Sequence, residues 1–188
     1  MNIEPTKISG VYICTPVPHE DERGYFMETY RQDLLAAGGI TDIFVQDNHA
    51  LSRLRNTVRG LHFQWNPPAA KLMRVSKGSV FLVAVDIRKG SPTFGEWVGV
   101  EATPENRKQL YAPAGCARGY QTLTDDCEVQ YKQAAFHNKL GEAEIAWNDP
   151  DIGIDWPIKE PPLLSARSNE APTLKDWIEN PISNFVVF

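Results

Sequence analysis

Residues 59–64 read Arg59-Gly60-Leu61-His62-Phe63-Gln64, an apolar run with an ionisable imidazole near its centre. In a β-strand successive side chains point to opposite faces, so the alternation predicts His62 and Gln64 on one face and Arg59 on the other. One face of this strand should therefore carry a base and an amide together. A histidine in such a run also fits a β-core residue satisfied by hydrogen bonds, so the neighbouring residues decide between the two interpretations.

Two cations follow His62 within a short distance along the chain. Lys71 and Arg74 belong to the next apolar run, Lys71-Leu-Met-Arg-Val75. A neutral histidine near such cations suits proton abstraction beside a carbonyl, because the cations can stabilise the enolate oxygen that develops. This cluster favours the catalytic interpretation of His62.

Strand-like runs follow one another through the middle of the chain, separated by turn signals such as Lys77-Gly78. The runs expected to form strands are residues 10–17, 25–30, 43–49, 57–64, 71–76, 79–86, 95–101, 109–112, 120–122 and 129–134. Helices are expected only at residues 31–37 and about 173–179. The pattern predicts an all-β sandwich or barrel with a few short peripheral helices.

Composition sets limits on the class of protein. With 188 residues, 42% of them hydrophobic and 23% charged, the chain is expected to form a single domain over residues 1–188, with a loop-rich C-terminal tail from about residue 149. The net charge of −5 argues against a nucleic-acid partner. Neither a membrane-spanning run nor a signal peptide is recognisable, and the three cysteines fit reduced thiols, so we expect a cytoplasmic location without a membrane partner.

Five separated blocks of the sequence carry a common family pattern. They are residues 21–28 (Asp-Glu-Arg-Gly-Tyr-Phe-Met-Glu), 44–49, 58–64, 83–95 and 147–150 followed by 154–157. On these blocks the chain resembles the dTDP-4-dehydrorhamnose 3,5-epimerase family. The resemblance implies a cupin-type double-stranded β-helix, or jelly roll, that is usually a homodimer and binds a nucleoside-diphosphate sugar inside the barrel. It further implies a metal-independent isomerase of deoxysugar biosynthesis, which inverts C3, C5 or both carbons of a 4-keto-6-deoxy sugar.

The resemblance also implies roles for individual residues. His62 would be the base, Lys71 would stabilise the enolate oxygen, and Tyr131 would donate a proton or contact the sugar. The residues expected to bind the nucleotide and substrate are Arg23, Phe26, Glu28, Gln46, Asn48, Arg59 and Arg118. Arginine suits this task because its planar guanidinium matches a diphosphate.

The chain departs from the family pattern at four positions. Arg118 replaces a pocket histidine, Leu82 replaces a polar residue, and Phe136 replaces a tyrosine regarded as the general acid. Ser168 stands where the family has the aspartate that orients the catalytic histidine, and its loss is expected to lower the rate strongly. Phe136 is expected to keep the aromatic wall of the pocket while lacking the phenol.

These departures leave several functions open. His137 and Tyr131 are the alternative acids for a divergent epimerase, including one that inverts a single carbon. A 3,4-ketoisomerase or tautomerase would need no donor on the opposite face, and a nucleotide-sugar-binding protein would need no catalysis. Metal-binding cupins carry paired histidines, whereas His62 stands alone, so we expect no metal and no other cofactor.

Overall fold

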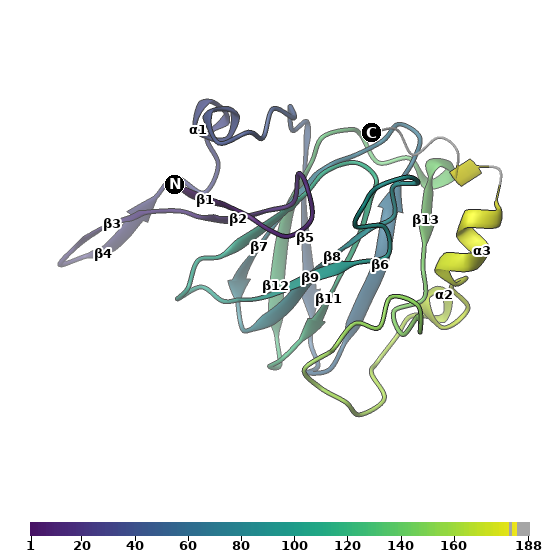
Figure 1. Ribbon diagram of the computed structural model, residues 1–188. Coiled ribbons are helices and arrows are strands. Elements are labelled where there is room, and N and C mark those ends of the chain that lie inside the picture. Colours follow the sequence, from purple (N-terminus) through teal and green to yellow (C-terminus); the bar gives the residue numbers. More distant parts are fainter. Residues whose placement is uncertain (181, 184–188) are drawn as a thin grey trace.

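The computed structural model describes residues 1–180 and 182–183, which form mainly two antiparallel sheets (Figure 1). One sheet has the order β1-β2-β10-β7-β12-β5, with bounds Asn2–Pro5, Tyr12–Thr15, Gln109–Ala112, Lys71–Lys77, Cys127–Gln133 and Gln46–Ser52. The other has the order β13-β6-β11-β8-β9, with bounds Glu142–Glu144, Val58–Gln64, Cys116–Thr122, Val80–Asp86 and Trp97–Ala102. Apart from the consecutive pairs β1-β2 and β8-β9, neighbouring strands of the two sheets are not consecutive in the chain, as in a jelly roll. The predicted all-β, cupin-type double-stranded β-helix is confirmed.

The core lies between the two sheets because alternate residues of each strand point inwards. Met73 of β7 and Val129 of β12 meet Leu82 of β8 and Val100 of β9 in one buried cluster. Leu82 is fully buried there, so the residue that replaces a polar group of the family pattern is part of the apolar core.

Short helices and loops cover the outer faces of the sheets. α1 (Gln32–Ala37) lies over the six-stranded sheet, with Leu35 buried against Leu72 of β7. α3 (Leu174–Glu179) lies beside β13 and β6 (Figure 1), and the Trp177 ring contacts Phe63 with ring centroids 4.6 Å apart. The face of β6 opposite His62 is thereby closed to solvent.

A bulge in β6 changes the face that Arg59 occupies. Arg118 of β11 pairs with His62, whereas Tyr120, two residues further, pairs with Arg59, so β6 contains one extra residue between these pairs. A bulge reverses the alternation of side chains beyond it. Arg59 and His62 therefore line the same cavity, and the prediction that they lie on opposite faces is wrong.

Two glycines allow β6 and β11 to approach closely at this bulge. A Cβ atom on Gly60 would lie 2.6 Å from the carbonyl oxygen of Arg118, and one on Gly119 would lie 2.6 Å from the carbonyl oxygen of Arg59. Both contacts are shorter than real Cβ atoms adopt, and both involve backbone that cannot move away alone. Glycine is therefore required at both positions.

Replacing Gly119 by Ala should accordingly destabilise the protein by about 1–3 kcal/mol, the usual cost of overpacking a core. Urea unfolding at neutral pH measures the difference. Gly38→Ala is the control, because the three atoms nearest to its new methyl group belong to the side chain of Ile3 and not to backbone. Equal unfolding midpoints for the Gly119→Ala variant and the parent would contradict this account of the bulge.

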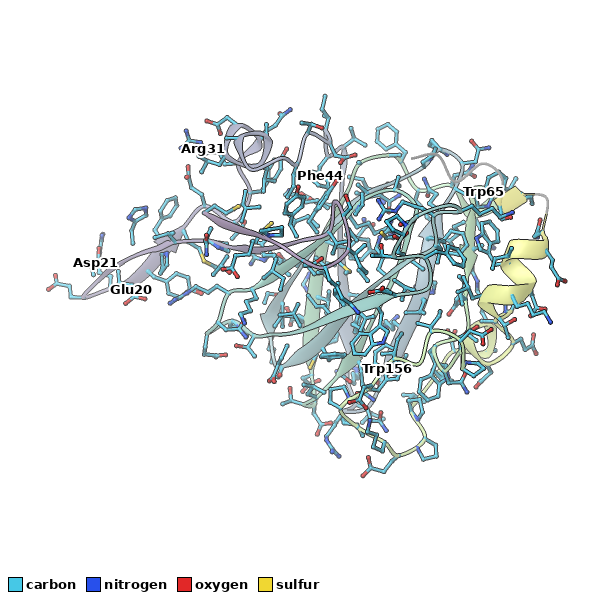
Figure 2. All side chains as sticks on the ribbon, viewed as in Figure 1. Glu20, Asp21, Arg31, Phe44, Trp65 and Trp156 are labelled. Carbon is cyan, nitrogen blue, oxygen red and sulfur yellow. The ribbon has the colours of Figure 1, made fainter. Side chains whose placement is uncertain are left out.

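The third sheet is a hairpin that extends away from the sandwich. β3 (Pro18–Asp21) pairs with β4 (Gly24–Met27), and Figure 2 shows Glu20 and Asp21 at its outer end. Val17, Tyr25 and Phe26 are exposed, Phe26 to 67%. The hairpin leaves large apolar side chains uncovered in the isolated chain.

Several predicted boundaries differ from the structure. β11 begins at Cys116 instead of residue 120, and the strands β1, β3 and β13 were not predicted. Between Asp149 and Asn180 the structure has the short helices α2 (Ala166–Asn169) and α3, joined by loops. Within residues 1–180 and 182–183, no helix combines the length and apolar character needed to cross a membrane.

Candidate active site

A cavity of about 140 Å³ lies between the two sheets and is lined by ionisable side chains from both. The five-stranded sheet contributes Arg59, His62, Arg118 and Tyr120, and the six-stranded sheet contributes Lys71 and Tyr131. The structure thus gathers all three predicted catalytic residues with two of the predicted binding residues.

His62 occupies the middle of a row of charged side chains across three neighbouring strands. Glu144 of β13 pairs directly with it on one side, and Arg118 of β11 pairs with it on the other. Directly paired residues of antiparallel strands point to the same face. His62 therefore lies between a carboxylate and a guanidinium, and its side chain remains 36% exposed.

The predicted stabiliser Lys71 enters the cavity from β7. Its Nζ lies 4.7 Å from the centre of the Tyr131 ring. Burial and, to a lesser extent, the charge of Arg118 lower the pKa of Lys71 to about 7, while Glu142 acts in the opposite direction. Near neutral pH this ammonium can therefore exchange its proton, and a developing anion beside it would favour the charged form.

Arg118 is a buried cation with unpaired hydrogen-bond donors. Only 3% of the residue is exposed, and burial lowers its pKa to about 10. Its Nη2 donates to the carbonyl oxygen of Ala69, while Nε and Nη1 have no hydrogen-bond partner in the described part of the chain. Buried unpaired donors are costly, so they indicate a position where an oxygen-rich ligand would bind.

Tyr131 retains its phenol proton at neutral pH. Burial and the nearby Glu142 raise its pKa, against the opposing charges of Arg118 and Arg59. Tyr120, which also lines the cavity, has a buried hydroxyl without a partner by hydrogen-bond geometry. Tyr120 is not among the site residues that the sequence predicts.

Glu144 is the most important residue that the sequence prediction missed. Its Oε2 lies 3.4 Å from Nε2 of His62 and 3.4 Å from Nε of Arg167. Burial acts to raise the pKa of Glu144, but contacts with His62 and Ser168 and the charge of Arg167 outweigh it, so the pKa lies below its usual range. A carboxylate therefore lies beside His62 even though Ser168 stands where the family pattern has its aspartate.

The other predicted binding residues of the sheet lie along β5, next to the cavity. Asn48 pairs directly with Tyr131, and Gln46 donates to Oδ1 of Asn48 over 2.8 Å. Arg59 is held towards the same strand, because its Nε donates to Oγ of Ser52 over 3.1 Å. A row of amides and a guanidinium therefore borders the catalytic cluster.

Three predicted binding residues lie elsewhere in the chain. Arg23 and Phe26 belong to the projecting hairpin and Glu28 follows it directly, so none of them lines the cavity of His62. Arg23 pairs with Asp21, and Glu28 lies 3.5 Å from Arg31. A single protomer does not bring them to the catalytic cluster.

The remaining departures from the family pattern can also be located. Phe136 is 71% exposed, so in the protomer it does not form the expected aromatic wall. The backbone of this loop is held by Gln64, whose amide donates to the Phe136 carbonyl oxygen. His137 lies 3.2 Å from Glu142, and Ser168 borders a second cavity that also contacts His62.

Comparison with known proteins identifies the family of this chain. Residues 5–176 match the family model described as dTDP-4-dehydrorhamnose 3,5-epimerase. The dTDP-4-dehydrorhamnose 3,5-epimerase of Salmonella typhimurium is 47% identical over 178 residues, which cover 93% of this chain and 96% of the relative. The chain belongs to the dTDP-4-dehydrorhamnose 3,5-epimerase family. The resemblance carried by the five sequence blocks is confirmed.

Solved structures of this epimerase family have the same fold. A dTDP-6-deoxy-D-glucose-3,5-epimerase from Legionella pneumophila, in complex with dTDP-4-keto-L-rhamnose, is 41% identical with a TM-score of 0.89, and the match covers 93% of both chains. The 3′-monoepimerase ChmJ of Streptomyces bikiniensis, in complex with dTDP-quinovose, is 36% identical with a TM-score of 0.87. That match covers 94% of this chain and 89% of ChmJ. The family therefore includes enzymes named for two inversions and one named for a single inversion.

Proposed function

We propose that the protein epimerises a dTDP-linked 4-keto-6-deoxy sugar in deoxysugar biosynthesis, using His62 as the base. The observation that carries this proposal is the cavity in which His62, between Glu144 and Arg118, faces Lys71 and Tyr131 from the opposite sheet. This arrangement combines a base, cations for an oxyanion and a protonated phenol within one space. The family membership of the chain supports the same substrate class.

The reaction begins when His62 removes the proton from a carbon beside the C4 ketone. The C–H electron pair forms the C=C bond of an enolate, and the carbonyl π electrons move to the oxygen. Lys71 and the unpaired donors of Arg118 stabilise that oxygen. Returning a proton to the opposite face of the carbon inverts it. Tyr131 is the donor, because it enters the cavity from the sheet opposite His62 and its raised pKa keeps the phenol protonated at neutral pH.

Binding of the nucleotide is assigned to the residues around this cluster. Arg59 presents a guanidinium that suits a diphosphate, while Gln46 and Asn48 can pair with polar edges of the base or sugar. Arg118 contributes a cation where the family pattern has histidine, and this cation binds part of the substrate next to His62. His137, next to Glu142, is the alternative acid if Tyr131 only contacts the sugar.

A single inversion or a 3,4-ketoisomerisation is the competing function. It is favoured by Phe136, because the tyrosine hydroxyl of the family pattern is missing and the ring is 71% exposed in the protomer. In a ketoisomerase, one base would move a proton on one face and the ketone would shift to C3. Both functions use the same enolate and differ in where the proton returns.

Solvent deuterium exchange tests the proposal. The purified protein is incubated in D₂O with dTDP-4-keto-6-deoxy-D-glucose, and NMR follows deuterium at C3 and C5 together with the configuration of each carbon. Exchange with inversion is the expected result, at one carbon for a monoepimerase and at both for a 3,5-epimerase. A ketone at C3 would replace the proposal by the ketoisomerase, and dTDP binding without exchange would leave only a binding protein.

We further propose that the protein is a homodimer in which the hairpin of one chain completes the site of the other. Tyr25 and Phe26 are large side chains that the protomer leaves exposed. The predicted binding residues Arg23, Phe26 and Glu28 do not line the His62 cavity of their own chain. The expected mass by light scattering at micromolar concentration is twice the 21.1 kDa of the chain. A mass near 21.1 kDa would contradict this proposal.

Mixing two inactive variants tests whether the sites are shared. If Arg23 acts in the partner's site, mixed dimers of Arg23→Ala and His62→Ala chains contain one site with both residues intact. Subunit exchange should then restore part of the activity that each variant lacks alone. Failure of fully exchanged mixed dimers to recover activity would place Arg23 outside the partner's site.

We also propose a cytoplasmic location. Cys14, Cys116 and Cys127 are buried and unpaired, which suits a reducing compartment.

A further inference from the structure

We propose that Glu144 is the positioning residue of His62, and that it takes over the task of the tail aspartate whose place is occupied here by Ser168. This inference rests on the proposed function, because it assumes that His62 is the base. It concerns a residue on strand β13, whereas the family pattern carries the orienting carboxylate in the C-terminal tail.

The strand ladder places Glu144 directly opposite His62. Glu142, Ala143 and Glu144 pair with Gln64, Phe63 and His62 in register. The backbone hydrogen bonds between Leu61 and Ile145, of 3.1 and 2.9 Å, close the ladder beyond this pair. Oε2 of Glu144 lies 3.4 Å from Nε2 of His62, so the carboxylate faces one nitrogen of the ring.

The burial of Glu144 argues for a functional partner. Only 2% of its side-chain surface is exposed, and by hydrogen-bond geometry neither carboxylate oxygen is satisfied by another described residue. A buried carboxylate is costly unless it is paired. Its charged neighbours are His62 and Arg167, and a positive charge on the ring of His62 would complete the pairing.

Arg167 favours the ionised form of the Glu144 carboxylate, although its closer ion pair is with another residue. Its Nε lies 3.4 Å from Glu144 Oε2, while its Nη1 lies 2.6 Å from Oε1 of Glu142. The shorter contact is with Glu142, which also pairs with His137. The guanidinium is thus shared between two carboxylates, and Glu144 retains charge for the imidazole.

Ser168 lies on the same side of His62 and cannot perform this task by itself. It borders a cavity with His62, and its hydroxyl lies 2.9 Å from Oγ of Ser165. A hydroxyl can accept a hydrogen bond, yet it supplies no charge against an imidazolium. The carboxylate of Glu144 reaches the ring from β13 and supplies that charge.

The pairing has two consequences for proton abstraction. A carboxylate that faces Nε2 holds the ring proton on that nitrogen, so the lone pair lies on the other nitrogen. When His62 takes the substrate proton, the ring becomes positive beside Glu144 and is stabilised by it. Glu144 therefore acts through His62 and does not touch the substrate.

Two substitutions of Glu144 separate charge from shape. Glu144→Gln keeps the size and removes the charge, whereas Glu144→Asp keeps the charge and shortens the side chain. We expect Glu144→Gln to lower kcat by about 10²-fold or more, with KM and dTDP affinity changed less than about threefold. Glu144→Asp should retain clearly more activity than Glu144→Gln. A purely structural role predicts the reverse order, because glutamine fits the site better.

The tautomer of His62 supplies a second measurement. Without the carboxylate 3.4 Å from Nε2, the ring proton is no longer held on that nitrogen, so the share of the Nε2-protonated tautomer seen by ¹⁵N NMR should fall in Glu144→Gln. The control is Glu128→Gln, which breaks a similar pair outside the site, 3.1 Å from Nε2 of His49. It should behave as the parent in both measurements.

The possible failures are distinguishable. Parental kcat in Glu144→Gln, or an aspartate variant no better than the glutamine variant, would overturn the role of Glu144. In that case, loss of exchange in His62→Ala would still uphold the proposed base. Undiminished exchange in His62→Ala would instead overturn the assignment of His62 as the base, whatever the Glu144 variants do.

Discussion

A His62→Ala variant should lose at least about 10²–10⁴-fold in the rate of solvent deuterium exchange beside the ketone, the usual contribution of a general base. The loss should lie in kcat, because the imidazole acts on the reacting carbon and the nucleotide is held by other residues. NMR of the dTDP-linked 4-keto sugar in D₂O measures the exchange. Titration calorimetry with dTDP should give an affinity close to that of the parent.

The control for this variant is His49→Ala. His49 lies on the outer face of β5, 53% exposed and paired with Glu128, so its loss removes an imidazole without touching the cavity. It should exchange at the parental rate. Full exchange in His62→Ala would show that another residue is the base, and a large loss of dTDP affinity would show that His62 binds substrate.

Removing the Lys71 ammonium should have the next largest effect. Lys71→Met keeps much of the side-chain volume and deletes a donor to the enolate oxygen, so kcat should fall by about 10²–10³-fold, as for other oxyanion donors. Lys77→Met is the matched control, because Lys77 lies on the same strand at its exposed end. An unchanged kcat in Lys71→Met would remove Lys71 from the mechanism.

The pH dependence follows from the lowered pKa of Lys71. The free enzyme loses this proton around pH 7, so kcat/KM should decline as the pH rises through about 7. A bound diphosphate and a developing enolate stabilise the ammonium, so the corresponding limb of kcat should lie at higher pH. The limb in kcat/KM should be missing in Lys71→Met, and its persistence would assign it to another group.

The buried Lys71 also makes the free energy of unfolding depend on pH. Its pKa is about 7 in the folded chain and 10.5 in the reference state, so the folded chain binds fewer protons between these values. The cost of burying the charge is therefore complete below pH 7 and disappears towards pH 10.5. The free energy of unfolding in urea should therefore increase from the parent to Lys71→Met, and this increase should be larger at pH 6 than at pH 9.

The sequence predicts most of the fold because its strands alternate or are uniformly apolar. Val80–Asp86 is buried along nearly its whole length and was recognised within one residue. β13 was missed because Glu-Ala-Glu has three residues and no apolar alternation. The first half of β11 was missed because Gly115 resembles a turn, although Cys116 to Gly119 are all buried between two neighbouring strands.

The site could be predicted only where it depends on local sequence or family pattern. His62, Lys71 and Tyr131 meet in one cavity as the pattern implied. The placement of Arg59 failed because a bulge is a property of the pairing between β6 and β11, which periodicity does not reveal. Glu144 was missed for a related reason, because its partner is 82 residues away and only the ladder joins them.

The position of Glu144 on a strand, and not on the tail, has a consequence for how the site fluctuates. A residue on a short terminal helix can leave its partner when that helix opens locally, which usually requires little free energy. Glu144 and His62 belong to adjacent strands joined by the backbone bonds of Leu61 and Ile145. They separate only when the edge of the sheet opens, so excursions of the C-terminal helices should leave the pair intact.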